Sequence, residues 1–183
     1  DVDVVIDGMD SMWARYALNY SCIRAGKPYV YGAAVGMHGV ASTIIPGKTA
    51  CLRCIYPSAQ DESLLSCSIV GVHPSVLGVI SSIQVSEAAK LVMGKEPSLL
   101  SKVLFFELSD MRFETFHVKR NPSCQDCGSF GKREHIITPL LERSCSRDGK
   151  GTYFVNPSVE PGIDISSIAR NIKRRKEGSD LQL

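Results

Sequence analysis

The sequence has little excess of either charge: its 183 residues include 21 lysines and arginines against 19 acidic residues, a formal charge of +2. So small a net charge does not support non-specific electrostatic binding to nucleic acid or to an anionic membrane. The sequence also lacks an apolar run of about 20 residues, the length that crosses a bilayer, and it begins without the basic segment and cleavage site of a secretory signal. We therefore predict a soluble, cytoplasmic protein with no membrane partner, and nucleic-acid binding stays a minor alternative.

Composition favours one globular domain with room for a small appendage. Hydrophobic residues make up 44% of the chain and charged residues 22%, which excludes disordered, collagen-like and coiled-coil proteins. The sequence lacks an initial Met and enters an apolar run at Val4 almost at once. We therefore expect the natural protein to begin further upstream.

Cysteine is too sparse for a disulfide scaffold, because the chain has only seven and an odd number cannot pair fully. Four of them form two C-x-x-C pairs, Cys51 with Cys54 and Cys124 with Cys127. Two such pairs supply four thiolates, which predicts a closed, structural zinc site. The alternatives are a redox pair or accidental spacing. The prolines and glycines around both pairs indicate loops, whereas a redox pair usually occurs singly at a helix start.

Apolar periodicity predicts an α/β arrangement at the start of the chain. A continuous apolar stretch is typical of a strand buried on both faces of a parallel sheet. A helix follows, with Asp10 or Ser11 as its cap and Gly26 as its stop. A second parallel strand comes next, and another strand follows a turn at 36–39. The predicted elements are a strand at 4–6, a helix at 11–25, and strands at 29–34 and 40–45.

The next segment is predicted to continue the same layer architecture. Polar residues without periodicity indicate an exposed crossover loop at 57–66. A long helix begins at Pro74 and ends before Gly94. Two apolar segments, 103–108 and 113–119, then predict an antiparallel hairpin.

We place a domain boundary near Gly128, where the balance of charge shifts. Residues 1–128 carry 11 basic and 12 acidic side chains, and residues 129–183 carry 10 and 7. The second part is too short to bury a core of its own. It is predicted to contain a strand at 152–155 and a short helix capped by Asp164, with the basic run at 170–176 as the solvated end of that helix.

Residues 1–128 carry a series of motifs in a fixed order. They are Asp7 and Asp10, Arg15 and Asn19, Gly26-Lys27-Pro28, Gly32 to Gly36, the first cysteine pair, Cys67, Gln84, Glu87 with Lys90, and the second cysteine pair followed by Gly128. This order resembles the ThiF/MoeB-type adenylyltransferases of the ubiquitin-activating (E1-like) superfamily. The resemblance implies a Rossmann-like mixed α/β sheet, the later half of that fold, at 1–128. A linker and partial C-terminal extension would occupy 129–183.

The resemblance implies ATP-dependent adenylation of a ubiquitin-like or sulfur-carrier protein at its C-terminal Gly-Gly carboxylate. ATP and Mg²⁺ would then be cofactors, because a metal held by a carboxylate neutralises phosphate charge and orients the attack. Asp10 matches the family's metal-binding and catalytic aspartate, and Arg15 its arginine one turn into the helix. From the residues alone, Asp10 equally suits a helix N-cap and Arg15 a solvated surface. Asp7 would support cofactor binding or cap the strand end. Ser11 stands where the family usually has Asn.

Cys67 matches a cysteine that, in the resembling enzymes, accepts the activated carrier as a thioester or acyl disulfide. Its alternative role is that of a small apolar residue packed under a loop. The sequence has no G-x-G-x-x-G phosphate loop, so we expect it to lack most of the nucleotide site and to be inactive alone. The resemblance also implies a homodimer. The rival functions are a non-catalytic, zinc-stabilised partner-binding subunit and a zinc oxidoreductase, which four thiolate ligands disfavour.

Overall fold

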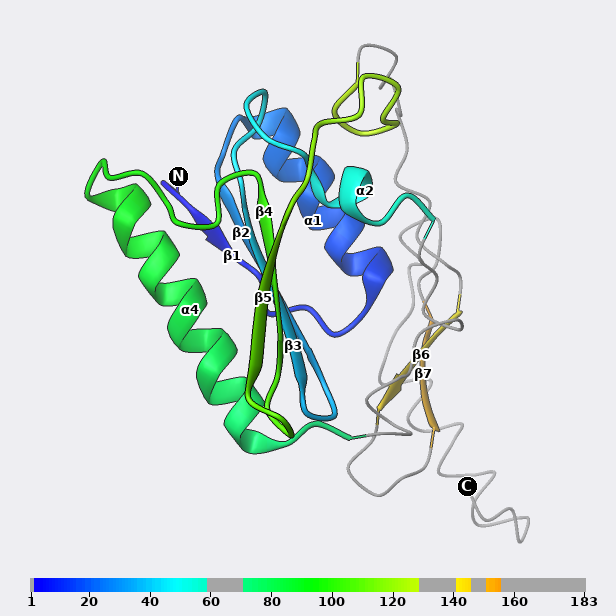
Figure 1. The fold of residues 1–183 in the computed structure, drawn as a ribbon. Coiled ribbons are helices and arrows are strands. Elements are labelled where there is room, and N and C mark those ends of the chain that lie inside the picture. The colour runs from blue at the N-terminus through cyan, green and yellow to red at the C-terminus, as the bar shows by residue number, and fades with distance from the viewer. Residues whose placement is uncertain (1, 59–70, 129–140, 146–150, 156–183) are drawn as a thin grey trace, which may run out of the picture. The chain divides into compact units, whose positions relative to one another are not determined.

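The computed structural model describes most of the chain. The described residues are 2–58, 71–128, 141–145 and 151–155. The main unit contains a five-stranded sheet in the order β1-β2-β3-β4-β5, with α1 on one face and α4 on the other (Figure 1). Its elements are β1 (Val5–Ile6), α1 (Met12–Ala25), β2 (Tyr29–Val35), β3 (His38–Ile44), α2 (Leu52–Ile55), α4 (Pro74–Val92), β4 (Lys102–Glu107) and β5 (Arg112–His117).

The sheet is mixed and has one parallel pair. β1 runs parallel to β2, as the predicted strand–helix–strand unit requires, whereas the pairs β2–β3, β3–β4 and β4–β5 are antiparallel. The strand predicted at 40–45 begins earlier, at His38, because a two-residue turn follows Val35. Gly36 in that turn has φ 57°, in the region that favours glycine.

Within the described residues the first strand is not buried on both faces, which differs from the prediction. Ile6 is 44% exposed. The reason is that β1 lies at the edge of the described sheet, with β2 as its only strand neighbour there. A short apolar run predicts a strand but does not say how many neighbours that strand has.

β2 sends alternate side chains to the two faces of the sheet, as the period of a strand requires. Tyr29 and Tyr31 join Tyr16 of α1 in one core cluster. Ala34 packs against the other cluster, which includes Val76 of α4 and is formed on the opposite face. Each helix therefore has its own buried contact with the sheet, and each fully buried large apolar side chain contributes about 1.5–3 kcal/mol.

The ends of α1 are defined by side-chain and glycine caps. The Ser11 hydroxyl accepts a hydrogen bond from the Ala14 N–H at 3.4 Å, and Gly26, with φ 64°, closes the helix through its N–H. The structure therefore assigns the N-cap to Ser11. Asp10 lies before the cap and is exposed.

Gln84 connects α4 to the carboxyl end of β1. Its Nε2 donates to the backbone oxygens of Asp7 at 2.9 Å and Val30 at 3.3 Å. This close approach depends on Gly32, because a Cβ there would lie 2.5 Å from the Gln84 Cδ. By length and composition alone, α4 could cross a membrane, and it is the only helix in the described residues that could. Its inner face packs on β2 and β3.

Glu87 is a buried carboxylate that fixes α4 to β3 and to the segment before β4. It is 2% exposed and accepts hydrogen bonds from Thr43, from Lys90 and from the backbone N–H groups of Ser98 and Leu99. Burial alone would raise the pKa of Glu87. The hydrogen bonds outweigh burial, and its pKa lies below the ordinary value.

We predict that Glu87→Gln weakens the fold in a pH-dependent way. A carboxyl whose pKa is lowered by folding adds stability above its unfolded pKa of about 4.3, and this stability is lost as the pH falls through the folded pKa. The variant should lose about 1–3 kcal/mol of unfolding free energy at neutral pH and show a shallower decline towards acid. Urea unfolding at several pH values checks this. Exposed Glu96→Gln is the control, and an unchanged pH slope in Glu87→Gln would contradict the prediction.

The described residues of a second unit are 141–144 and 151–155. The strands β6 (Leu141–Cys145) and β7 (Gly151–Val155) form a separate two-stranded sheet. β7 coincides with the strand predicted at 152–155, whereas β6 was not predicted. The helix expected after Asp164 lies outside the described residues, and the domain limits 1–128 and 129–183 stay a prediction.

Candidate active-site loop and metal centre

The loop that follows β1 is held by one buried carboxylate. The Asp7 side chain has no exposed surface. Its Oδ2 accepts hydrogen bonds from the Tyr29 hydroxyl at 2.7 Å and from Arg15 Nε at 3.2 Å, and its Oδ1 accepts from the Met9 N–H at 2.8 Å. Arg15 also donates to the Met9 carbonyl at 2.5 Å. These bonds fix the backbone immediately before Asp10.

Arg15 and Tyr29 both donate hydrogen bonds to the buried side chain of Asp7. Burial and the neighbouring Asp7 raise the pKa of Tyr29, so the phenol remains protonated and donates. The Arg15 side chain is only 12% exposed, and its guanidinium lies 5.9 Å from the centre of the Tyr31 ring. The alternative that Arg15 is a solvated surface residue is therefore wrong.

The structure brings two of the predicted site residues into direct contact. Asp7 and Arg15 form an ion pair, and exposed Asp10 ends the loop that they hold. Cys67 lies outside the described residues. The sequence analysis did not identify Tyr29 as a site residue, because the apolar pattern indicated only that it lies in a strand. Gln84 belongs to the ordered series of motifs in residues 1–128, but its position in the sequence did not indicate a hydrogen bond to the Asp7 carbonyl.

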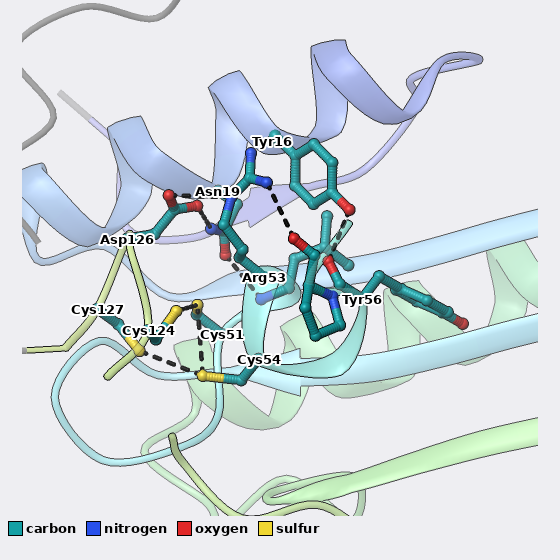
Figure 2. A network of polar contacts seen from close by, with 11 residues as sticks. Tyr16, Asn19, Cys51, Arg53, Cys54, Tyr56, Cys124, Asp126 and Cys127 are labelled. Carbon is teal, nitrogen blue, oxygen red and sulfur yellow. Dashed lines mark hydrogen bonds and ion pairs between the residues drawn. The ribbon is translucent and has the colours of Figure 1, made fainter. Parts of the chain in front are cut away.

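Four cysteine sulfurs gather where α2 meets the segment after β5 (Figure 2). The Sγ atoms of Cys51 and Cys54 are 3.8 Å apart, those of Cys51 and Cys124 3.6 Å, and those of Cys54 and Cys127 3.4 Å. All four lie within 4.8 Å of one another, and none is in a disulfide. The two predicted pairs therefore form one cluster. The prediction that both pairs lie in loops is wrong for the first pair, because Cys51 is the N-cap of α2 and Cys54 lies within that helix.

The cluster fits a tetrahedral ion. Zinc bound to sulfur at about 2.3 Å places its ligands about 3.8 Å apart, close to the separations found here. Burial and the neighbouring thiols Cys127 and Cys124 raise the pKa of Cys51. A bound cation has the opposite effect and deprotonates the thiols that coordinate it. Four thiolates would fill the coordination sphere of such an ion, so the arrangement suits a structural ion and opposes zinc-dependent redox chemistry.

Local backbone contacts shape the second cysteine loop. The Asn121 N–H donates to the Cys54 sulfur at 3.4 Å, which joins this loop to α2. The Gly128 N–H donates to the Cys124 carbonyl at 2.9 Å. A Cβ on Gly128 would lie 2.5 Å from that carbonyl oxygen and 2.7 Å from the Cys124 nitrogen. Only glycine therefore fits after Cys127.

Comparison with known proteins matches the same part of the chain. Residues 1–126 match the model of the ThiF family. The SAMP-activating enzyme E1 of Haloferax volcanii is 37% identical over 130 residues, 70% of this chain and 48% of that protein. The adenylyltransferase and sulfurtransferase MOCS3-1 of Drosophila pseudoobscura pseudoobscura is 33% identical over 142 residues, 76% of this chain and 31% of that protein.

The fold comparison agrees. A crystal structure of E. coli MccB with MccA-N7isoASN has a TM-score of 0.59 at 21% identity, over 69% of this chain and 41% of that chain. The mixed sheet and the sequence relatives define an α/β domain of the E1-like class. The chain belongs to the ThiF family, which confirms the resemblance predicted from the order of its motifs. It spans about half, or less, of the length of these relatives.

Proposed function

We propose that this chain is part of an enzyme that uses ATP to adenylate the C-terminal glycine of a ubiquitin-like or sulfur-carrier protein. The carrier carboxylate attacks the α-phosphorus of ATP, the bond between the α- and β-phosphates breaks, and pyrophosphate leaves. The observation that carries this proposal is the loop fixed by Asp7 and Arg15, which ends in exposed Asp10 in a member of the ThiF family. The names of the relatives, an activating enzyme and an adenylyltransferase, support it.

In this proposal Asp10 is the catalytic, metal-binding carboxylate. Mg²⁺, when bound, would neutralise phosphate charge and favour the meeting of two anions. Because Ser11 supplies the helix cap, Asp10 has no part in capping α1 and an oxygen donor is available. Asp7 and Arg15 position the loop through Met9. We also propose that the four cysteines bind structural Zn²⁺.

The chain supplies only part of the proposed site. Its sequence has no G-x-G-x-x-G, so we expect the 183 residues alone to bind ATP poorly. The alternative function is a non-catalytic subunit that uses the metal-stabilised fold to bind a partner, and it requires that the rest of the full-length protein also lacks phosphate-binding residues. Homodimerisation and a cytoplasmic location stay predictions.

The two functions differ in an exchange assay. The full-length gene product that contains this sequence is incubated with ATP, Mg²⁺, labelled pyrophosphate and a carrier protein that ends in Gly-Gly. We expect carrier-dependent incorporation of label into ATP, because adenylation is reversible before the adenylate is consumed. Absence of exchange with a panel of Gly-Gly carriers, in protein that binds those carriers, would contradict the enzyme and support the partner-binding subunit.

We predict that Cys67→Ser separates adenylation from transfer. If Cys67 accepts the activated carrier, the variant should retain pyrophosphate exchange and lose the covalent adduct, because a hydroxyl is a far weaker nucleophile than a thiolate at neutral pH. Intact-mass spectrometry of the reaction mixture measures the adduct. Cys145→Ser is the control and should form as much adduct as wild type. An undiminished adduct in Cys67→Ser would contradict the role.

A further inference from the structure

A buried amide on α1 contacts both halves of the metal centre. Asn19 is fully buried, and its two polar atoms bond to different cysteine segments (Figure 2). Its Oδ1 accepts from the Leu52 N–H at 2.9 Å, and its Nδ2 donates to Asp126 Oδ2 at 2.9 Å. Leu52 follows Cys51 in the first pair, and Asp126 precedes Cys127 in the second. One side chain therefore joins two cysteine segments, the start of α2 and the second cysteine loop, that are 73 residues apart in the sequence.

An ion pair also joins the start of α2 to the second cysteine loop. Arg53, which lies between Cys51 and Cys54, donates through Nε to Asp126 Oδ1 at 3.1 Å. The side chains are 15% and 3% exposed. A buried ion pair is favourable only when its remaining polar atoms are satisfied, and Asn19 satisfies the second carboxylate oxygen of Asp126. Each partner lies inside its own C-x-x-C.

α1 supports this connection at a second point. The Arg53 guanidinium lies 3.7 Å from the centre of the Tyr16 ring, a cation–π contact that fixes its plane. The Tyr16 hydroxyl donates to the Tyr56 carbonyl at 2.6 Å, just beyond α2. Tyr16 and Asn19 are three residues apart on one face of α1 and are both buried. The start of α2 and the second cysteine loop are therefore both attached to α1.

We propose that Asn19, Arg53 and Asp126 form a positioning bridge that fixes the two C-x-x-C segments relative to each other and thereby sets how tightly the centre retains its ion. Apolar residues of the same volume would stabilise a core at least as well, but they would not set the register of two separate segments. Groups that support metal ligands typically change metal affinity 10- to 100-fold. This inference rests on the proposed zinc centre and goes beyond it by naming the residues that position its ligands.

The test removes one donor and then restores it. Asn19→Asp keeps an oxygen for the Leu52 N–H but places a second carboxylate against Asp126. In the full-length gene product, we expect the zinc dissociation constant to rise about 10- to 100-fold, with faster release to a chromogenic chelator. Adding Asp126→Asn rebuilds an amide–carboxylate pair, and the double variant should recover affinity to within about tenfold of wild type.

A charge control and a second bridge variant show whether a change in zinc affinity comes from the bridge. Gln125→Glu adds the same charge at an exposed position of the same loop, and its zinc affinity should stay within about twofold of wild type. If Asn19→Asp does not fold, Arg53→Lys tests the bridge, because it keeps the charge but loses the planar contact with Tyr16. Unchanged zinc affinity in the folded variants would overturn the bridge. A wild-type protein without stoichiometric zinc would instead overturn the metal centre.

Discussion

Asp10→Ala is expected to abolish ATP–pyrophosphate exchange in the full-length gene product. The side chain stands at the end of a loop whose backbone is fixed by Asp7 and Arg15, so the substitution removes a carboxylate without moving its support. Loss of one preorganised electrostatic group typically lowers kcat about 100- to 1000-fold, and loss of a metal-binding carboxylate should reach at least the upper end. Exchange of labelled pyrophosphate into ATP, with the carrier present, measures the effect.

Two measurements separate catalysis from folding in this variant. Asp3→Ala removes another exposed carboxylate at the other end of β1 and should leave exchange unchanged. Zinc content and melting temperature should be the same in Asp10→Ala and wild type, because Ser11 caps α1 and Asp10 is exposed. Normal exchange in Asp10→Ala would show that the reaction does not depend on this carboxylate.

Most elements of the main unit could be predicted because local patterns determine them, whereas the short helix α2 was not predicted. Ser11 and Gly26 mark the ends of α1, and alternation along β2 follows from burial on two faces. The number of neighbours of β1 could not be predicted, because strand pairing depends on contacts between distant segments. The exposure of Ile6 is the result.

The cysteine cluster could be predicted from local spacing, whereas the contacts of Arg15 and Asn19 could not, because they join distant segments. C-x-x-C spacing is a local signal, and two such pairs indicate one ion. Arg15 was assigned by resemblance, but its burial against Asp7 depends on Tyr29 and on the Met9 backbone, which lie in other elements. The bond from Asn19 to Asp126 spans 107 residues, and no periodicity in the sequence indicates it.

The largest effect on stability is expected from Cys124→Ser. Cys124 Sγ lies 3.6 Å from Cys51 Sγ, and a hydroxyl at neutral pH does not replace a thiolate as a zinc ligand. Structural zinc contributes about 10–16 kcal/mol of apparent binding free energy in small domains, as much as or more than the 5–15 kcal/mol by which a typical domain is stable. We expect zinc content to fall from about one ion per chain to near zero and the melting temperature to fall by at least about 10 °C.

Cys22→Ala shows whether this loss belongs to the ion. Cys22 is a buried thiol of the same core cluster, and burial raises its pKa, so it behaves as a small apolar side chain. The variant should keep its zinc and lose at most about 1.5 kcal/mol of stability. Wild-type protein stripped by a chelator should melt where Cys124→Ser melts, because both lack the ion. If Cys124→Ser retained its zinc, or if stripped and loaded wild type melted together, the four thiols would not form a metal centre that holds α2 and the second cysteine loop to α1.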